Sequence, residues 1–271
     1  MIYLLFSPGK SLGQGNLLVT PKRVVFENAK RSEELNIANT GSDSATFLIS
    51  FIQIRMTDDG TFEKIELPDS AQHFADKYLR LFPRSVTLGP NEAQTVKVQV
   101  TRKNELVPGE YRSHLYFRAV PKEQPLGEKQ PETDAISVRM VPIFGISMPI
   151  IVRVGESNAK VILSDVTFNM DRDTIPSLKM TFNRTGNMSV YGDVSVDYIS
   201  LQGKKTRVGT VKGLAVYTPN SLRHFNLLLN KVANVDYRSG KLHLVYSDQS
   251  VRPVILAEEE IVLGSKMALK K

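Results

Sequence analysis

The sequence predicts an all-β protein built from two β-sandwich domains. Three observations carry this prediction: polar and apolar residues alternate along most runs, turn residues separate the runs about every 8 to 15 residues, and the pattern restarts after 155–158. Residues 92–101 alternate throughout, which is typical of a strand with one buried face. Helical spacing hardly occurs.

The first domain is predicted to contain about seven strands, separated by turn residues such as Asn39-Thr40-Gly41 and Pro108-Gly109. The expected strands are 17–26, 33–39, 45–56, 61–65, 84–88 together with 93–101, 109–120, and 136–154. One helical turn is expected within 69–82. A long connection rich in proline and charge, 121–134, precedes the last strand, and its composition fits a functional loop and a mobile hairpin equally well.

The second domain repeats the alternation of the first. Its expected strands are 160–169, 177–183, 190–201, 207–212, 223–229, 241–246 and 254–263. The chain then consists of a leader (1–14), a first domain (15–155), a second domain (156–265) and a tail (266–271). Because the link at 155–158 is too short for independent movement, the domains are expected to keep a fixed or hinged angle with a cleft between them.

The leader is similar to the end of an export signal. Residues 2–6 form a short apolar run, and Ser11-Leu12-Gly13 has the small-x-small pattern of a signal-peptidase site. We therefore expect an exported protein whose cleaved signal peptide is truncated here. The alternative is a disordered leader that takes no part in the fold.

Composition and spacing exclude several classes of function. The net charge is +7, but the basic residues are scattered rather than clustered with aromatic residues, so nucleic acid is not an expected partner. The chain has no cysteine, and its four histidines, His73, His114, His224 and His243, lack the spacing of metal ligands. Gly13-Gln14-Gly15 lacks the third glycine of a phosphate-binding loop. We therefore expect no enzyme, no cofactor, no metal and no small-molecule substrate.

The unusual segment of the sequence is 136–148. Its even positions are all apolar, and its odd positions are apolar in the middle. A strand that is apolar on both faces must bury both, whereas an edge strand of a sandwich offers only one face to its own core. Another molecule is therefore a candidate to cover the second face, and the alternative is the second domain or a loop. Pro142 and Pro149 favour an edge position, because proline lacks the N–H that an interior ladder requires.

Several segments, in matching order and spacing, resemble the PapD-like periplasmic chaperones of pilus and fimbria assembly. In the first domain the similar segments are 20–26, which begins Thr20-Pro21-Lys22-Arg23, then Asn39, 82–88, 94–98 and 109–115. In the second domain they are 182–187, 190–192 and 214–217. The resemblance covers nearly the whole chain after the leader. It implies two immunoglobulin-like (PapD-like) β-sandwich domains set at an angle.

The same resemblance implies a non-enzymatic chaperone for pilin-like subunits whose own sandwich lacks a final strand. Members of the family lend the last strand of their first domain to the subunit by donor-strand complementation and deliver it to an outer-membrane usher. On this analogy Val138, Met140, Phe144 and Ile146 enter the subunit. Because exposed apolar strands favour self-association, a self-dimer through this strand or a covering loop is expected when no subunit is bound.

The resemblance also implies an anchor for the terminal carboxylate of the subunit. The family uses an arginine on the first strand and a lysine on the lent strand. Arg23 takes the arginine position, whereas Pro149 takes the position of the lysine. This difference, together with Pro142 inside the lent segment, indicates a divergent branch. Arg139 and Arg153 are candidates to replace the lysine.

Two alternatives stay open at this point. A non-chaperone, two-domain adhesive or structural module at the cell surface would bind through loops or a β-face and would bury its last strand completely. A hydrolase on a β-scaffold would need a histidine or carboxylate cluster that only the fold brings together. The exposure of Met140, Phe144 and Ile146 separates the chaperone from the adhesive module.

Overall fold

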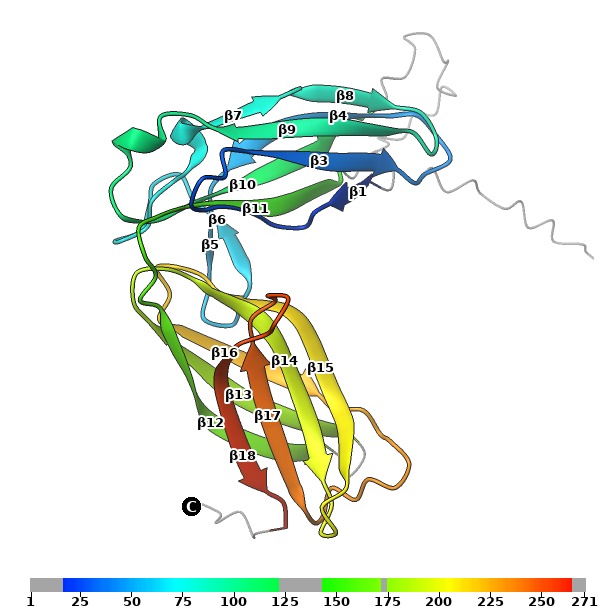
Figure 1. Ribbon diagram of the computed structural model, residues 1–271. Coiled ribbons are helices and arrows are strands. Elements are labelled where there is room, and N and C mark those ends of the chain that lie inside the picture. Colours follow the sequence, from blue (N-terminus) through cyan, green and yellow to red (C-terminus); the bar gives the residue numbers. More distant parts are fainter. Residues whose placement is uncertain (1–16, 122–142, 172–174, 265–271) are drawn as a thin grey trace, which may run out of the picture. The chain divides into compact units, whose positions relative to one another are not determined.

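The computed structural model describes residues 17–121, 143–171 and 175–264, which form two compact units (Figure 1). Of the described residues, the first unit contains 17–53, 74–106, 111–121 and 143–152, and the second contains the others. The helical elements of this part are two 3-10 turns, η1 (Asp76–Tyr78) and η2 (Lys103–Glu105). The all-β prediction is confirmed, and η1 lies where one helical turn was expected. No helix within the described ranges is long and apolar enough to cross a membrane.

Two sheets make up the sandwich of the first unit. One sheet has the order β1 (Leu17–Thr20), β3 (Ser32–Asn39), β9 (Ala93–Val100) and β7 (Leu79–Phe82). The other has the order β2 (Val24–Phe26), β11 (Gly145–Val154), β10 (Gly109–Ala119), β4 (Ala45–Ile52) and β8 (Ser85–Leu88). Alternate residues of both sheets, such as Leu35, Val98 and Leu115, are buried in the core.

Proline moves the chain from one sheet of the first unit to the other at two places. The sequence predicts a single strand over 17–26, but Pro21 separates β1, which pairs with β3, from β2, which pairs with β11. Pro83 separates β7 from β8 in the same way, and both prolines follow a cis peptide bond. Because proline has no N–H, a ladder does not continue through it. The prediction of one continuous strand at 17–26 is therefore wrong.

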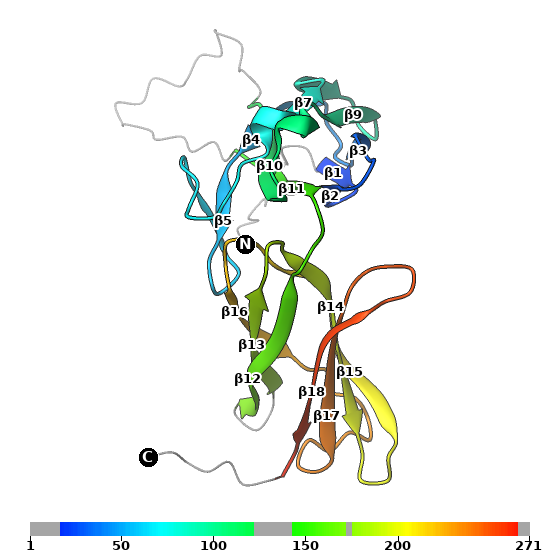
Figure 2. The same cartoon turned by 60° about the vertical axis from the view of Figure 1, so that its left-hand side comes forward.

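The last strand of the first unit, β11, lies between β2 and β10 over part of its length. β2 runs parallel to β11 and pairs with residues Ile150 to Val152 (Figure 2). The predicted edge position is therefore wrong for these residues, because β2 forms the edge there. Pro149 comes directly before this pairing, so its missing N–H removes no bond to β2. Pro142 lies outside the described residues.

The second unit is a sandwich of a three-stranded and a four-stranded sheet (Figure 2). The first sheet has the order β12 (Lys160–Asp171), β13 (Ile175–Thr185) and β16 (Leu222–Leu228). The second has the order β15 (Lys205–Val216), β14 (Val190–Ile199), β17 (Lys241–Ser247) and β18 (Ile255–Val262). Leu178 and Phe182 from one sheet and Val196 and Leu244 from the other form its core. The seven strands predicted for this part of the chain are all present.

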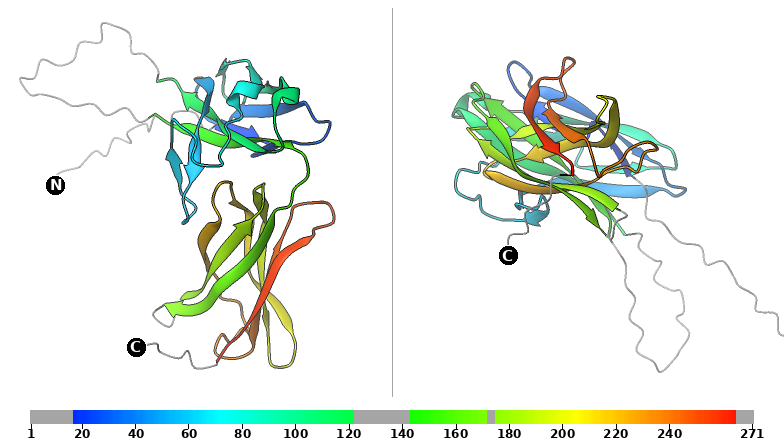
Figure 3. Two further views of the ribbon diagram at one scale, coloured as in Figure 1. Left: turned by 90° about the vertical axis from the view of Figure 1, so that its left-hand side faces the viewer. Right: turned by 90° about the horizontal axis from the view of Figure 1, so that it is seen from below.

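A hairpin from the first half of the sequence belongs to the second unit (Figure 3). It consists of β5 (Ile54–Met56) and β6 (Phe62–Lys64). The Asn220 side chain donates a hydrogen bond to the Met56 carbonyl at 2.5 Å, and the His224 N–H donates to the Asp58 carbonyl at 2.6 Å. The sequence predicts 45–56 as one strand, whereas the structure divides it into β4 in the first unit and β5 in the second.

Candidate functional site

The residues that lead into β11, together with the first residues of the strand, carry an exposed apolar face. Phe144 and Ile146 are 57% and 40% exposed, whereas Met148, the next residue on the same face, is 2% exposed. Alternate side chains of a strand point to the same side, so this face passes from solvent into the core between Ile146 and Met148. Ile143, on the opposite face, is 49% exposed. We call Ile143, Phe144 and Ile146 the exposed apolar segment.

Beside this segment, no described strand pairs with the edge of β11 that faces β2, and we call this stretch the open edge. Among the described residues, β2 pairs with β11 only from Ile150 to Val152. The N–H and C=O groups on this edge of Gly145 to Ser147 therefore have no ladder partner in the described part of the chain. An apolar face and an open edge thus meet on the same few residues.

Two contacts fix the register between β10 and β11. The Ala119 N–H donates to the Phe144 carbonyl at 3.0 Å, and Arg153 pairs with Glu110 at 3.0 Å. Counting between these two antiparallel contacts places His114 beside Pro149 and Arg112 beside Ile151.

The parallel register between β2 and β11, continued by one residue, places Arg23 on the other side of Pro149. Val24 and Phe26 face the core, so Arg23 faces outward. His114 and Arg112 also face outward, because Leu115 and Phe117 of the same strand are core residues. Arg23, Arg112 and His114 therefore share the outer face of the five-stranded sheet, and we call them the basic cluster.

Two members of the basic cluster are deeply buried. Arg112 and His114 are each 2% exposed, and Arg23 is partly buried. Burial, and to a smaller extent the positive charge of Arg112, together lower the pKa of His114 to about 3. His114 is therefore neutral near pH 7, and the two arginines supply the positive charge of the cluster.

Three of the predicted site residues lie in the described part of the chain, and two do not. Phe144 and Ile146 lie together on one exposed face, and Arg23 lies beside Pro149, the position that the resemblance gives to the lysine. Val138 and Met140 lie outside the described residues, as do Arg139 and residues 122–134. Sequence reasoning missed Arg112. The alternation of β10 could have placed it on the same face as His114.

Arg153, the other candidate to replace the lysine, takes part in a buried polar network of the second unit. Its Nε pairs with Glu110 at 3.0 Å, and its Nη2 donates to the Ser189 carbonyl at 2.8 Å. The Glu110 carboxylate also accepts hydrogen bonds from the Ser189 N–H at 3.0 Å, from the Ser189 hydroxyl and from the Thr218 hydroxyl at 3.3 Å. This carboxylate is fully buried and well provided with donors, which is the arrangement of a structural ion pair rather than of a catalytic acid.

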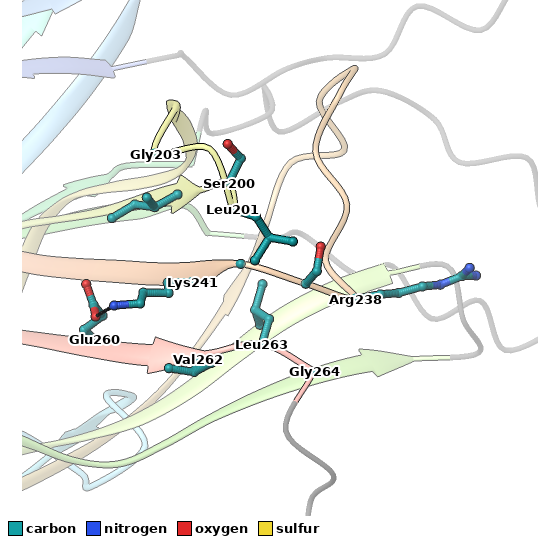
Figure 4. A pocket seen from close by; sticks show the side chains of 12 residues that line it. Ser200, Leu201, Gly203, Arg238, Lys241, Glu260, Val262, Leu263 and Gly264 are labelled. Atoms are coloured by element: carbon teal, nitrogen blue, oxygen red, sulfur yellow. Dashed lines mark hydrogen bonds and ion pairs between the residues drawn. The ribbon is translucent and has the colours of Figure 1, made fainter.

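One pocket of about 520 Å³ lies at an end of the four-stranded sheet of the second unit (Figure 4). It is lined by residues of the β14–β15 turn and of β17 and β18, including Leu201 and Val262. Lys241 and Glu260 on its wall pair with each other at 2.7 Å. Their charges compensate each other, so this pocket shows no set of groups suited to acid–base chemistry. Within the described ranges, no group of three or more histidine or acidic residues could hold a metal ion.

No family model matches the sequence, and no curated protein matches it. Solved structures similar to the chain include the YadV chaperone, at 14% identity over 91% of this chain and 99% of that chain, with a TM-score of 0.43. The Pseudomonas aeruginosa CupB2 chaperone is similar at 14% identity, 91% and 100% coverage and a TM-score of 0.45. The Salmonella enterica SafB chaperone, solved in complex with the SafA pilin, is similar at 12% identity, 92% and 96% coverage and a TM-score of 0.41.

At these identities and TM-scores, similarity by itself does not assign the chain to a family or a function. The similar structures are nevertheless of the class that the sequence resembles. This chain thus aligns, over most of its length, with solved structures of pilus and fimbrial chaperones.

Proposed function

We propose that the chain is a non-enzymatic periplasmic chaperone that binds incomplete immunoglobulin-like pilin or fimbrial subunits by donor-strand complementation. It would deliver them to an outer-membrane usher. The observation that carries this proposal is the exposed apolar segment at the start of β11, next to an open strand edge. No nucleotide is needed, because the energy comes from folding of the subunit when a more complementary strand replaces that of the chaperone.

Both properties of the segment suit strand addition. The open edge at Gly145 to Ser147 can form main-chain hydrogen bonds with an extended guest strand. Phe144 and Ile146 lie on one face of β11, so both can enter the unfilled core of the same guest. Because each side chain is already about half buried, covering the rest of both contributes roughly 1.5 to 3 kcal/mol to the association before the entropy of ordering is subtracted.

The basic cluster supports the anchor that the resemblance implies. β2 begins just beyond the open edge, so a guest strand that follows this edge ends near Arg23. Arg112, across β11 from β2, is buried at 2% exposure and adds positive charge to the same face without being open to the guest. Guanidinium groups bind carboxylates through paired hydrogen bonds, which suits the terminal carboxylate of a subunit.

Co-expression with a pilin-like subunit encoded beside the chain tests the proposal. The double variant Phe144→Asp/Ile146→Asp should abolish the soluble complex, because it puts charge into the apolar contact. Both residues are exposed in the free chain, so the variant should fold normally, as circular dichroism can verify.

The matched control is Leu18→Asp/Ile162→Asp, which changes two exposed aliphatic residues on β1 and β12. This control should retain the complex. A complex that survives in the Phe144→Asp/Ile146→Asp variant would rule out donation by this segment and favour the adhesive module.

A further inference from the structure

Gly145 of β11 lies directly under the ring of Tyr116 from β10. A methyl group on Gly145 would come within 2.4 Å of Cε2 and Oη and within 2.5 Å of Cζ of Tyr116. Real side chains do not approach so closely, so any larger residue at 145 must displace the ring or the strand. The backbone of Gly145 has no positive φ, so the requirement for glycine comes from this contact and not from the turn of the chain.

The contact lies on the face of β11 opposite to Phe144 and Ile146. Because successive residues of a strand point to opposite faces, Gly145 lies on the outer face of the sheet together with Tyr116. Phe144 and Ile146 point to the other face. Phe144 and Ile146 keep about half of their surface exposed, and among the described residues β2 does not pair with this part of the strand. The packing of the Tyr116 ring on Gly145, on the outer face of the sheet, can therefore hold this part of β11 against β10.

We propose that Tyr116 is a positioning residue for the subunit-binding segment, whose ring on Gly145 keeps residues 143–147 in register with β10. The role in subunit binding rests on the proposed function, whereas the contact between Tyr116 and Gly145 is independent of it. A strand that is already ordered loses less conformational entropy when it binds a guest. The hydrogen bond from the Ala119 N–H to the Phe144 carbonyl, at 3.0 Å, reports on the same register.

The first test uses the free chain, without any subunit. Amide hydrogen exchange at Ala119 should accelerate about tenfold or more in Gly145→Ala, because the methyl group displaces the ring. Tyr116→Ala should accelerate it as well, and Tyr116→Phe, which keeps the ring, should leave it near the wild-type rate. The Ile49 amide, which donates to the Arg84 carbonyl at 2.8 Å in the same sheet, is the internal control and should not change.

The double variant Gly145→Ala/Tyr116→Ala decides whether the two residues act through one contact. If they do, its exchange rate at Ala119 equals that of Tyr116→Ala alone, because there is no ring left for the methyl group to displace. The contact would be contradicted if the two single variants raised the exchange rate at Ala119 independently, so that their effects multiplied in the double variant. A wild-type exchange rate in Gly145→Ala would contradict it as well.

The second test is capture of a co-expressed pilin-like subunit. Gly145→Ala should lower capture about tenfold or more, and Tyr116→Phe should retain it. Faster exchange at Ala119 combined with wild-type capture in Gly145→Ala would overturn the positioning role. If the wild-type chain captures no subunit, the proposed function fails, and the exchange experiment still decides the Tyr116–Gly145 contact.

Discussion

Arg23 and His114 lie on either side of Pro149, in one row across the outer face of the five-stranded sheet. Their Cα atoms are separated by two strand spacings, about 10 Å. Arg112 occupies the next position of β10 on the same face. Three basic residues thus surround Pro149, at the position where the resemblance implies a lysine. They lie next to the open edge of β11.

We expect Arg23→Ala to weaken binding of a pilin-like subunit about tenfold or more, because a hydrogen bond to a charged group is lost. Titration of the purified chain with the subunit measures this change. Added salt should weaken wild-type binding more than that of the variant, since an ion pair is screened. Arg80→Ala, at an exposed position on β7, is the control. Equal affinities of Arg23→Ala and wild type would contradict the anchor.

The depressed pKa of His114 makes the stability of the chain depend on pH. Its pKa is about 3 in the folded chain against 6.5 ordinarily, so the unfolded state binds more protons between these values. The free energy of unfolding should therefore fall as the pH is lowered from about 6.5 towards 3. The contribution of His114 has a slope of up to about 1.4 kcal/mol per pH unit.

Denaturant unfolding of His114→Gln between pH 4 and 7 checks this expectation. The variant should lose stability less steeply than the wild type as the pH falls, and His73→Gln, at an exposed position, is the matched control. In Arg112→Met the pKa of His114, followed by NMR, should rise, because a neighbouring positive charge is removed. An unchanged slope in His114→Gln would contradict the burial of a neutral imidazole.

The ion pair between Glu110 and Arg153 predicts a large effect on stability. Removing one partner leaves the other as a buried charge, so Glu110→Gln and Arg153→Met should each destabilise the second unit by about 3 kcal/mol. Thermal unfolding followed by calorimetry measures the loss. The double variant should lose less than the two single losses added together, because no unpaired charge is left. Additive losses would show that the two residues act independently.

The sequence by itself determined the sandwich fold and most of its strands. Alternation at Val96, Val98 and Val100 depends on neighbouring residues only, because successive side chains of any strand point to opposite faces. The same rule placed Phe144 and Ile146 on one apolar face. It also gave the second unit its strands, up to a few residues at their ends.

Only the tertiary structure decided which of these apolar residues stay exposed. Ile146 and Met148 follow the same alternation, yet Met148 is 2% exposed and Ile146 is 40% exposed. Three other features depend in the same way on strands far apart in sequence. They are the switch of sheet at Pro21, the position of Arg112 across β11 from Arg23, and the packing of Tyr116 on Gly145. Local alternation fixes the face of a side chain, whereas long-range pairing fixes what covers that face.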